Sequence, residues 1–141
     1  MASSDVQQTL IIVKPDGFQR GLVGEIISRF EAADFSVVGL RCIQLTDELA
    51  GEFYQEHAGK DFYDGLVEFM TSSPVALLAL ERNDAIARAR QIVGKTNPLE
   101  ATPGTIRADL GLDGGRNTVH ASDSPASAER ELGLMMPEMI R

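Results

Sequence analysis

The chain has 141 residues, 43% hydrophobic and 24% charged, so it can bury one sizeable core and fits a single domain over 1–141. Its 13 basic and 21 acidic residues give a net charge of −8, which argues against a general nucleic-acid binder, since such proteins usually present a basic face. A polyanionic substrate would have to be held by a few lysines and arginines concentrated at one site, because the overall field repels it.

The cysteine count and the absence of targeting segments indicate the compartment. The one cysteine, Cys42, excludes an intrachain disulfide, and its apolar, strand-like surroundings predict a buried reduced thiol. One cysteine and two widely separated histidines give no zinc-site spacing. The polar N-terminus lacks signal-peptide features, and no apolar stretch approaches the ~20 residues that span a bilayer. We expect a cytoplasmic protein with no membrane association.

The first part of the chain alternates strand-like and helix-like patterns. A short apolar run at 9–13 predicts a buried strand, which the turn residues at 14–17 end. Apolar residues at helical spacing predict a helix at 22–30. The β-branched segment 35–45 predicts a second strand, and Thr46 is placed to cap the helix that follows it.

The middle of the chain continues the alternation and then loses its regular pattern. A helix is expected at 61–70 and a third buried strand at 75–80. Asn83 is expected to cap a helix at 84–93. The segment 94–116 contains two prolines and five glycines and reads as a long irregular loop. Loops of this length are uncommon unless they carry a function.

The last part of the chain supplies a fourth strand, at 118–120, and a final helix. Ser124 and Pro125 predict the start of this helix, as its N-cap and its first helical residue. The order of elements fits an α+β fold, with a ferredoxin-like four-stranded antiparallel sheet covered by helices and a long functional loop before the last strand.

The octet Asn-Thr-Val-His-Ala-Ser-Asp-Ser at 117–124 is the most informative stretch of the chain. It surrounds His120, one of only two histidines, with small and hydrogen-bonding residues. A histidine at a strand end, facing a helix N-terminus, suits phosphate chemistry. Free backbone N–H groups there bind anions, and neutral imidazole is a competent nucleophile. A lone histidine is more often structural, but the octet as a whole favours a site.

The pattern N-x-x-H-A-S-D-S resembles the active-site motif of nucleoside diphosphate kinases. The resemblance covers about 9–136, and 14–27, 66–74 and 96–107 match in order and spacing. It implies the antiparallel four-stranded core of that family. It also implies an enzyme that moves the γ-phosphate of a nucleoside triphosphate to a nucleoside diphosphate, by a ping-pong mechanism through a phosphohistidine at His120.

Phosphoryl transfer needs mainly positive charge and hydrogen-bond donors around the moving group. Lys14 follows the first strand and could be either a surface charge or a site residue, but its K-P-D context resembles an early motif of the family. Arginines can grip phosphate oxygens through paired hydrogen bonds. The resemblance implies that the nucleotide is bound by Lys14, Phe62, Arg90, Thr96, Arg107 and Asn117.

The resemblance also implies supporting roles around His120. Composition alone would make Glu131 a surface charge, whereas the matching glutamate of the family bonds the ring nitrogen that does not react, which fixes the tautomer. Ser122 matches a serine that supports this glutamate, and Tyr54 matches a position near the lysine and the histidine. Phe62, a core aromatic by default, matches a residue that stacks on the base, so broad base acceptance is implied. The catalytic set implied is His120, Lys14, Glu131, Tyr54 and Ser122.

A P-loop is suggested by Gly94-Lys95-Thr96 and is rejected. The first glycine that a P-loop requires would fall at Ala89, and the preceding residues predict a helix interior rather than a strand. Lys95 is therefore expected to be a solvated lysine.

The chain also departs from the family in a few places. Ala121 and Ser73 stand where glycine is common, and Asp61 where proline is common, but none of them removes a site residue. The tail after Glu131 is short and rich in methionine, at positions 135, 136 and 139, and exposed apolar residues of this kind often mark an interface.

Three functions fit these observations. The first is a nucleoside diphosphate kinase that uses Mg²⁺ bridging the nucleotide phosphates, with few or no protein ligands. Its partners would be nucleoside triphosphates and diphosphates rather than nucleic acid, and it would form a homo-oligomer, a tetramer or hexamer built from dimers. The alternatives are a non-catalytic regulatory or nucleic-acid-binding protein on the same fold and a phosphohistidine carrier. The net charge and the intact residue set favour the enzyme.

Overall fold

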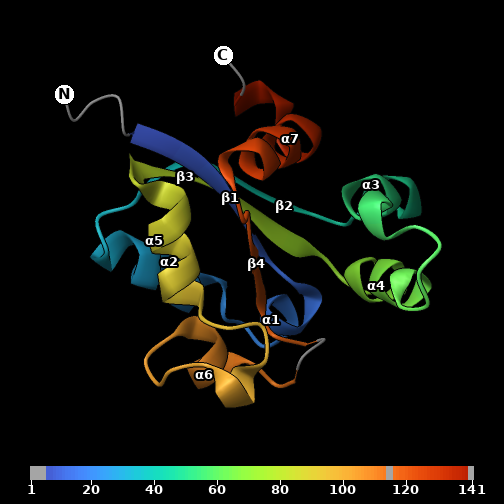
Figure 1. Ribbon diagram of the computed structural model, residues 1–141, viewed down its shortest axis with the longest axis horizontal. Coiled ribbons are helices and arrows are strands. Elements are labelled where there is room, and N and C mark those ends of the chain that lie inside the picture. The colour runs from blue at the N-terminus through green and yellow to red at the C-terminus, as the bar shows by residue number, and fades with distance from the viewer. Residues whose placement is uncertain (1–5, 114–115, 140–141) are drawn as a thin grey trace.

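The computed structural model describes residues 6–113 and 116–139 and contains a four-stranded antiparallel sheet with helices on both faces (Figure 1). The strands lie in the order β2-β3-β1-β4. They are β1 (Val6–Val13), β2 (Ser36–Ile43), β3 (Val75–Asn83) and β4 (Val119–Ala121). This arrangement confirms the predicted α+β, ferredoxin-like fold.

The helices fill the connections between these strands. The α-helices are α1 (Pro15–Gln19), α2 (Val23–Ala32), α3 (Asp47–Phe53), α4 (Tyr63–Met70), α5 (Ala85–Val93), α6 (Ile106–Leu110) and α7 (Pro125–Met135). Short 3₁₀ turns are η2 (Gln55–His57), η3 (Pro98–Glu100) and η4 (Pro137–Met139). In the part of the chain that the structure describes, no helix combines the length and the apolarity needed to cross a membrane.

Alternate side chains of the central strands enter two separate cores. On one face, Ile11 of β1 packs with Ile26 and Phe30 of α2 in a cluster that α5 also covers. On the other face, Leu10 packs with Leu132 of α7 and with residues of α3 and α4. Figure 1 shows α2 and α5 on one side of the sheet and α3, α4 and α7 on the other. Because both faces are covered, β1 and β3 contain continuous apolar runs instead of alternating patterns.

Two of the three predicted helix caps are confirmed. The Thr46 side chain accepts a hydrogen bond from the N–H of Leu49, and Ser124 accepts one from the N–H of Ser127. The cap predicted at Asn83 is wrong, since this residue ends β3. The cap position of α5 is Asp84, which has a left-handed φ of 57° and makes no side-chain capping bond.

Two segments expected to lack regular structure are partly helical. The predicted turn after Lys14 is the short helix α1, which Pro15 begins with a φ already suited to a helix. The segment 94–116 contains η3 and α6, and Thr105 caps α6 through a bond from the N–H of Ala108. Both α-helices have five residues, which is too short for an apolar period to mark them.

Burial corrects two further predictions. Cys42 is exposed, not buried, because β2 lies at the edge of the sheet and pairs only with β3 among the described residues. Met135 and Met136 are 1% and 0% exposed and belong to the core that α7 covers, so they form no exposed apolar surface. The side chain of Met139 lies outside the described residues.

Candidate active site

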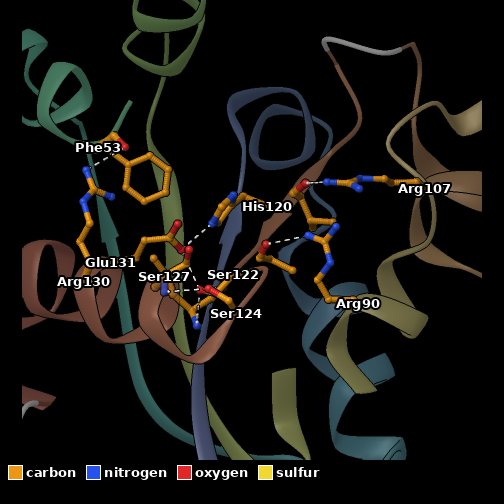
Figure 2. A network of polar contacts seen from close by, with 12 residues as sticks. Phe53, Arg90, Arg107, His120, Ser122, Ser124, Ser127, Arg130 and Glu131 are labelled. Carbon is orange, nitrogen blue, oxygen red and sulfur yellow. Dashed lines mark hydrogen bonds and ion pairs between the residues drawn. The ribbon is translucent and has the colours of Figure 1, made fainter. Parts of the chain in front are cut away.

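His120 lies in the middle of β4, where it pairs with Ile12 of β1. The prediction placed it at the strand end, but the pairing with β1 continues to Ala121 and extends the strand past it. The chain then turns at Ser124 into α7, which packs against β1 and places Glu131 against His120 (Figure 2). The His120 ring therefore contacts a side chain from within α7 and not the N-terminal end of this helix.

The His120 ring is held through one nitrogen. Its Nε2 lies 2.8 Å from Oε1 of Glu131, and the Ser122 hydroxyl donates to the same oxygen at 2.7 Å. Glu131 is 8% exposed and Ser122 is fully buried. A carboxylate bonded to Nε2 keeps the proton there in the neutral ring, so that Nδ1 carries the lone pair. Among the described residues Nδ1 has no hydrogen-bond partner, which leaves it available for chemistry.

Aromatic residues close one side of this histidine. The Phe53 ring meets the His120 ring edge to face, with centroids 5.0 Å apart, and Tyr54 packs on Phe53 at 4.9 Å. Burial raises the pKa of Tyr54, and the nearby Glu131 raises it further, so its phenol stays protonated. Arg130 donates to the backbone carbonyls of Glu52 and Phe53 and joins the end of α3 to α7.

Lys14 and Asn117 form a second group, near the start of β4. The Lys14 ammonium donates to Oδ1 of Asn117 at 2.9 Å, and Nδ2 of Asn117 donates to the backbone oxygen of Thr96 at 3.0 Å. Burial lowers the pKa of Lys14 to about 8, the nearby Arg107 lowers it as well, and Asp16 partly opposes them. This ammonium is costly to keep charged unless an anion lies beside it.

Two arginines contact the strand that carries His120. Arg107 is 6% exposed and donates to the carbonyls of Gly94 and Val119. Arg90 donates to the carbonyl of Ala121, and Figure 2 shows both arginines on the side of His120 away from Phe53. Burial lowers the pKa of Arg107 to about 10, and the nearby Arg90 lowers it as well, so the Arg107 guanidinium remains charged at neutral pH. The buried Nε of Arg107 has no partner among the described residues and is a donor that an anion could satisfy.

Phe62 lies farther out, with 51% of its surface exposed. It connects to the other residues through His57, whose ring centroid lies 5.2 Å from that of Phe62 and 6.4 Å from that of Tyr54. His57 was not predicted as a site residue, although it is the second histidine and lies between Tyr54 and Phe62 in the sequence. Its Nδ1 is buried and lacks a partner in the described part of the chain, so it is a further candidate for a polar contact with a ligand.

The structure thus brings most of the predicted site residues around β4, with Tyr54 and Phe62 reaching it through aromatic contacts. Cations, unsatisfied donors and a histidine with one available nitrogen lie together, an arrangement that suits the transfer of an anionic phosphoryl group. Lys95 is exposed, as expected for a solvated lysine. Within residues 6–113 and 116–139, no group of three or more histidine, cysteine or acidic side chains is arranged to hold a metal ion.

Comparisons with known proteins identify the family. The family model described as nucleoside diphosphate kinase matches residues 7–140. A nucleoside diphosphate kinase of Carboxydothermus hydrogenoformans is 55% identical over 133 residues, which cover 94% of this chain and 89% of the relative. The chain belongs to the nucleoside diphosphate kinase family.

Solved structures of nucleoside diphosphate kinases have the same fold. The enzyme of Aquifex aeolicus superposes with a TM-score of 0.91 at 46% identity, covering 93% of this chain and 95% of the other. The enzyme of Halobacterium salinarum, solved in complex with CDP, superposes with a TM-score of 0.90 at 45% identity, covering 92% of this chain and 87% of the other.

Ala121, where nucleoside diphosphate kinases commonly have glycine, is 3% exposed, and its methyl group packs in the core beneath α5.

Proposed function

We propose that this chain moves the γ-phosphate of a nucleoside triphosphate to a nucleoside diphosphate, with His120 as the covalent carrier. One observation supports this most directly. Glu131 occupies Nε2 of His120, while Nδ1 is left available on a strand whose carbonyls are bonded by Arg90 and Arg107. The relatives named nucleoside diphosphate kinase, at about half identity over most of the chain, support the same reaction.

In the first half-reaction, the lone pair on Nδ1 of His120 attacks the γ-phosphorus. A nitrogen–phosphorus bond forms as the bond from phosphorus to the β,γ-bridging oxygen breaks, and the nucleoside diphosphate leaves. The proton on Nε2 stays in its bond to Glu131, whose carboxylate stabilises the positive charge that the ring gains. Ser122 holds that carboxylate in place.

The second half-reaction reverses these steps. A β-phosphate oxygen of a different nucleoside diphosphate attacks the phosphohistidine, the nitrogen–phosphorus bond breaks, and neutral His120 is restored. One site serves both directions, because each leaving group is chemically the same as the next acceptor. The kinetics are therefore ping-pong.

The cations and donors would hold the nucleotide during both steps. Lys14, Arg90 and Arg107 would neutralise phosphate oxygens, and the unpartnered Nε of Arg107 would gain an acceptor. Thr96 would add a hydroxyl, and Asn117 would reach the ribose. Phe62 would stack on the base with its ring face. Tyr54 would lie near Lys14 and His120 and help to position them.

Nucleoside diphosphate kinases need a divalent cation, and we propose that Mg²⁺ serves here. The donor set around His120 is cationic, which suits a metal that is held by the nucleotide phosphates and not by protein carboxylates. Bound Mg²⁺ would reduce the negative charge of the nucleotide phosphates, while Lys14, Arg90 and Arg107 would hold their oxygens.

A labelling experiment tests the function. The protein is incubated with [γ-³²P]ATP and then chased with an unlabelled nucleoside diphosphate, with His120→Ala as the matched variant. Acid-labile label that moves to the nucleotide supports the enzyme, and the variant should take up no label. Absence of label on the wild type would support the non-catalytic binding protein, and label that moves only to a protein acceptor would support the carrier.

We also propose a cytoplasmic homo-oligomer, a tetramer or hexamer built from dimers. The exposed edge strand β2, with Leu40 51% exposed, supports self-association, because an open strand edge can pair with another chain. Its mass in solution would test this.

A further inference from the structure

Thr118, two residues before His120, has an uncommon backbone conformation. Its φ is 79°, in the left-handed region that β-branched residues rarely adopt. The N–H of Val119 donates to the carbonyl of Asn117 at 2.9 Å and closes a three-residue γ-turn around Thr118. The positive-φ form of this turn is rare and strained. Such strain persists only where the surrounding contacts impose it.

Three contacts hold this turn in place. The Thr118 carbonyl accepts a bond from the N–H of Lys14 at 2.8 Å. Its hydroxyl lies 3.2 Å from Oδ2 of Asp16 and 3.2 Å from the carbonyl of Leu110, and its one proton serves one of them at a time. Its methyl carbon would lie 2.9 Å from a Cβ atom at position 17, so only Gly17 leaves room for it.

The turn sets the directions of site residues on both sides of it. Before the turn, Asn117 reaches the Lys14 ammonium at 2.9 Å. After it, the carbonyl of Val119 accepts a bond from Arg107 at 2.8 Å, and His120 follows directly. A change in the torsion of the turn would therefore move Asn117 and Lys14 relative to His120.

We propose that Thr118 is a positioning residue for phosphoryl transfer. The hydroxyl of Thr118, bonded to buried Asp16, holds the strained turn in place. The turn directs the side chain of Asn117 toward Lys14 and the ring of His120 toward the phosphate. The inference rests on the proposed function, because it concerns the geometry of that transfer. Thr118 acts through its neighbours, since it is fully buried behind them.

The test compares kcat and KM of Thr118→Val and Thr118→Ser with the wild type. Valine has nearly the shape of threonine but leaves the Asp16 carboxylate without this donor, and a buried acceptor without a donor is costly. We expect kcat of Thr118→Val to fall on the order of tenfold. Thr118→Ser keeps the hydroxyl and should stay within about threefold of the wild type.

Thr9→Val is the matched control. Thr9 is also fully buried, and its hydroxyl has no hydrogen-bond partner among the described residues. Removing this hydroxyl should change kcat by less than about twofold. Thermal unfolding of each variant separates a loss of catalysis from a loss of folded protein.

Gly17→Ala reaches the turn without touching its hydrogen bonds. The added Cβ atom would meet the methyl group and carbonyl of Thr118, so kcat should fall although every polar partner remains. If Thr118→Val does not fold, Gly17→Ala and Thr118→Ser decide the matter: normal kcat in Gly17→Ala would overturn the proposal.

A folded Thr118→Val variant with kcat within about twofold of the wild type would also overturn it, as would an equal loss in Thr9→Val. A wild type that transfers no phosphate would overturn the proposed function instead.

Discussion

Lys14 has a charge that depends strongly on its surroundings. Burial and Arg107 lower its pKa from 10.5 to about 8. Below pH 8 both the folded and unfolded states are protonated at this lysine, and the folded state bears the cost of burying the charge. Between about pH 8 and 10.5 the unfolded state binds more protons, so the contribution of Lys14 to stability rises with pH. A bound phosphate would reverse the shift, because an anion favours the ammonium.

Nucleotide binding should therefore take up protons at a pH slightly above 8. Calorimetric titration with a nucleoside diphosphate, in two buffers of different ionisation enthalpy, measures this uptake directly. Lys14→Gln should abolish it, because the titrating group is gone. Lys95→Gln removes an exposed lysine and should leave it unchanged. Proton uptake that persists in Lys14→Gln would show that another group titrates.

Arg107 combines a buried position with an Nε donor that lacks a partner in the described part of the chain. Arg107→Ala should lower kcat/KM by a factor of about tens to thousands, the range of single electrostatic contacts in active sites. Arg107→Lys keeps a charge but loses the paired geometry and should recover only part of the activity.

Arg116→Ala is the control for Arg107, since Arg116 is exposed and pairs with Asp113. It should leave kcat/KM nearly unchanged. Urea unfolding of Arg107→Ala is needed beside the kinetics, because Arg107 also bonds two backbone carbonyls. A kcat/KM within about twofold of the wild type would remove Arg107 from the site.

Elements with a strong local signal were predictable from the sequence. The buried strands around Leu10 and Leu78 are continuous apolar runs, and Thr46 and Ser124 have side chains that satisfy helix N–H groups. Helices of five residues, such as α6, carry no periodic signal and were missed. The exposure of Cys42 follows from the position of β2 at the sheet edge, which a strand pattern does not encode.

The candidate site was predictable as a set of residues but not as a geometry. The octet around His120 and the resemblance it carries named nearly all of its members. The ring contacts of His57 with Tyr54 and Phe62 depend on the local conformation of the segment between α3 and α4, and the bonds from Arg130 to α3 depend on tertiary packing, so neither was visible in the sequence. Residue types alone do not show which side chains meet when segments far apart in the chain are packed together.

Arg130 joins α3 and α7, the two helices that contact His120 through Phe53 and Glu131. It donates to the carbonyls of Glu52 and Phe53 at 2.6 and 3.2 Å, at the C-terminal end of α3, where a cation is favourable. Arg130→Ala should lower the free energy of unfolding by about 1 kcal/mol, since these are charge-assisted bonds that solvent weakens at an exposed side chain. It should also lower kcat a few-fold, because Phe53 packs on His120.

Urea unfolding and steady-state kinetics measure the two effects of Arg130→Ala. Arg88→Ala is the control, because Arg88 bonds Gln91 within its own helix and should change neither quantity much. If Arg130→Ala matches Arg88→Ala in both measurements, the link between α3 and α7 has no role in the site.

At the scale of the whole molecule, the net charge of −8 and the cationic site have opposite effects on a nucleotide. Lys14, Arg90 and Arg107 lie together near β4, so attraction is local and the rest of the surface repels polyanions. This distribution suits a small anion that enters one site better than an extended nucleic acid that needs a basic face.

The exposed apolar residues are the whole-molecule feature that bears on assembly. A tetramer or hexamer built from dimers needs two different interfaces. Leu40 on β2 is 51% exposed, and Leu99 in η3 is 90% exposed, so they are candidates for separate contacts.

Leu40→Lys and Leu99→Lys should each leave a smaller oligomer, and the double variant should approach the 15.3 kDa monomer. Light scattering measures these masses, and Glu100→Lys, which changes charge beside Leu99 without removing apolar surface, is the control. Because a charge buried without a partner at an interface is costly, wild-type mass in both single variants would place the contacts elsewhere.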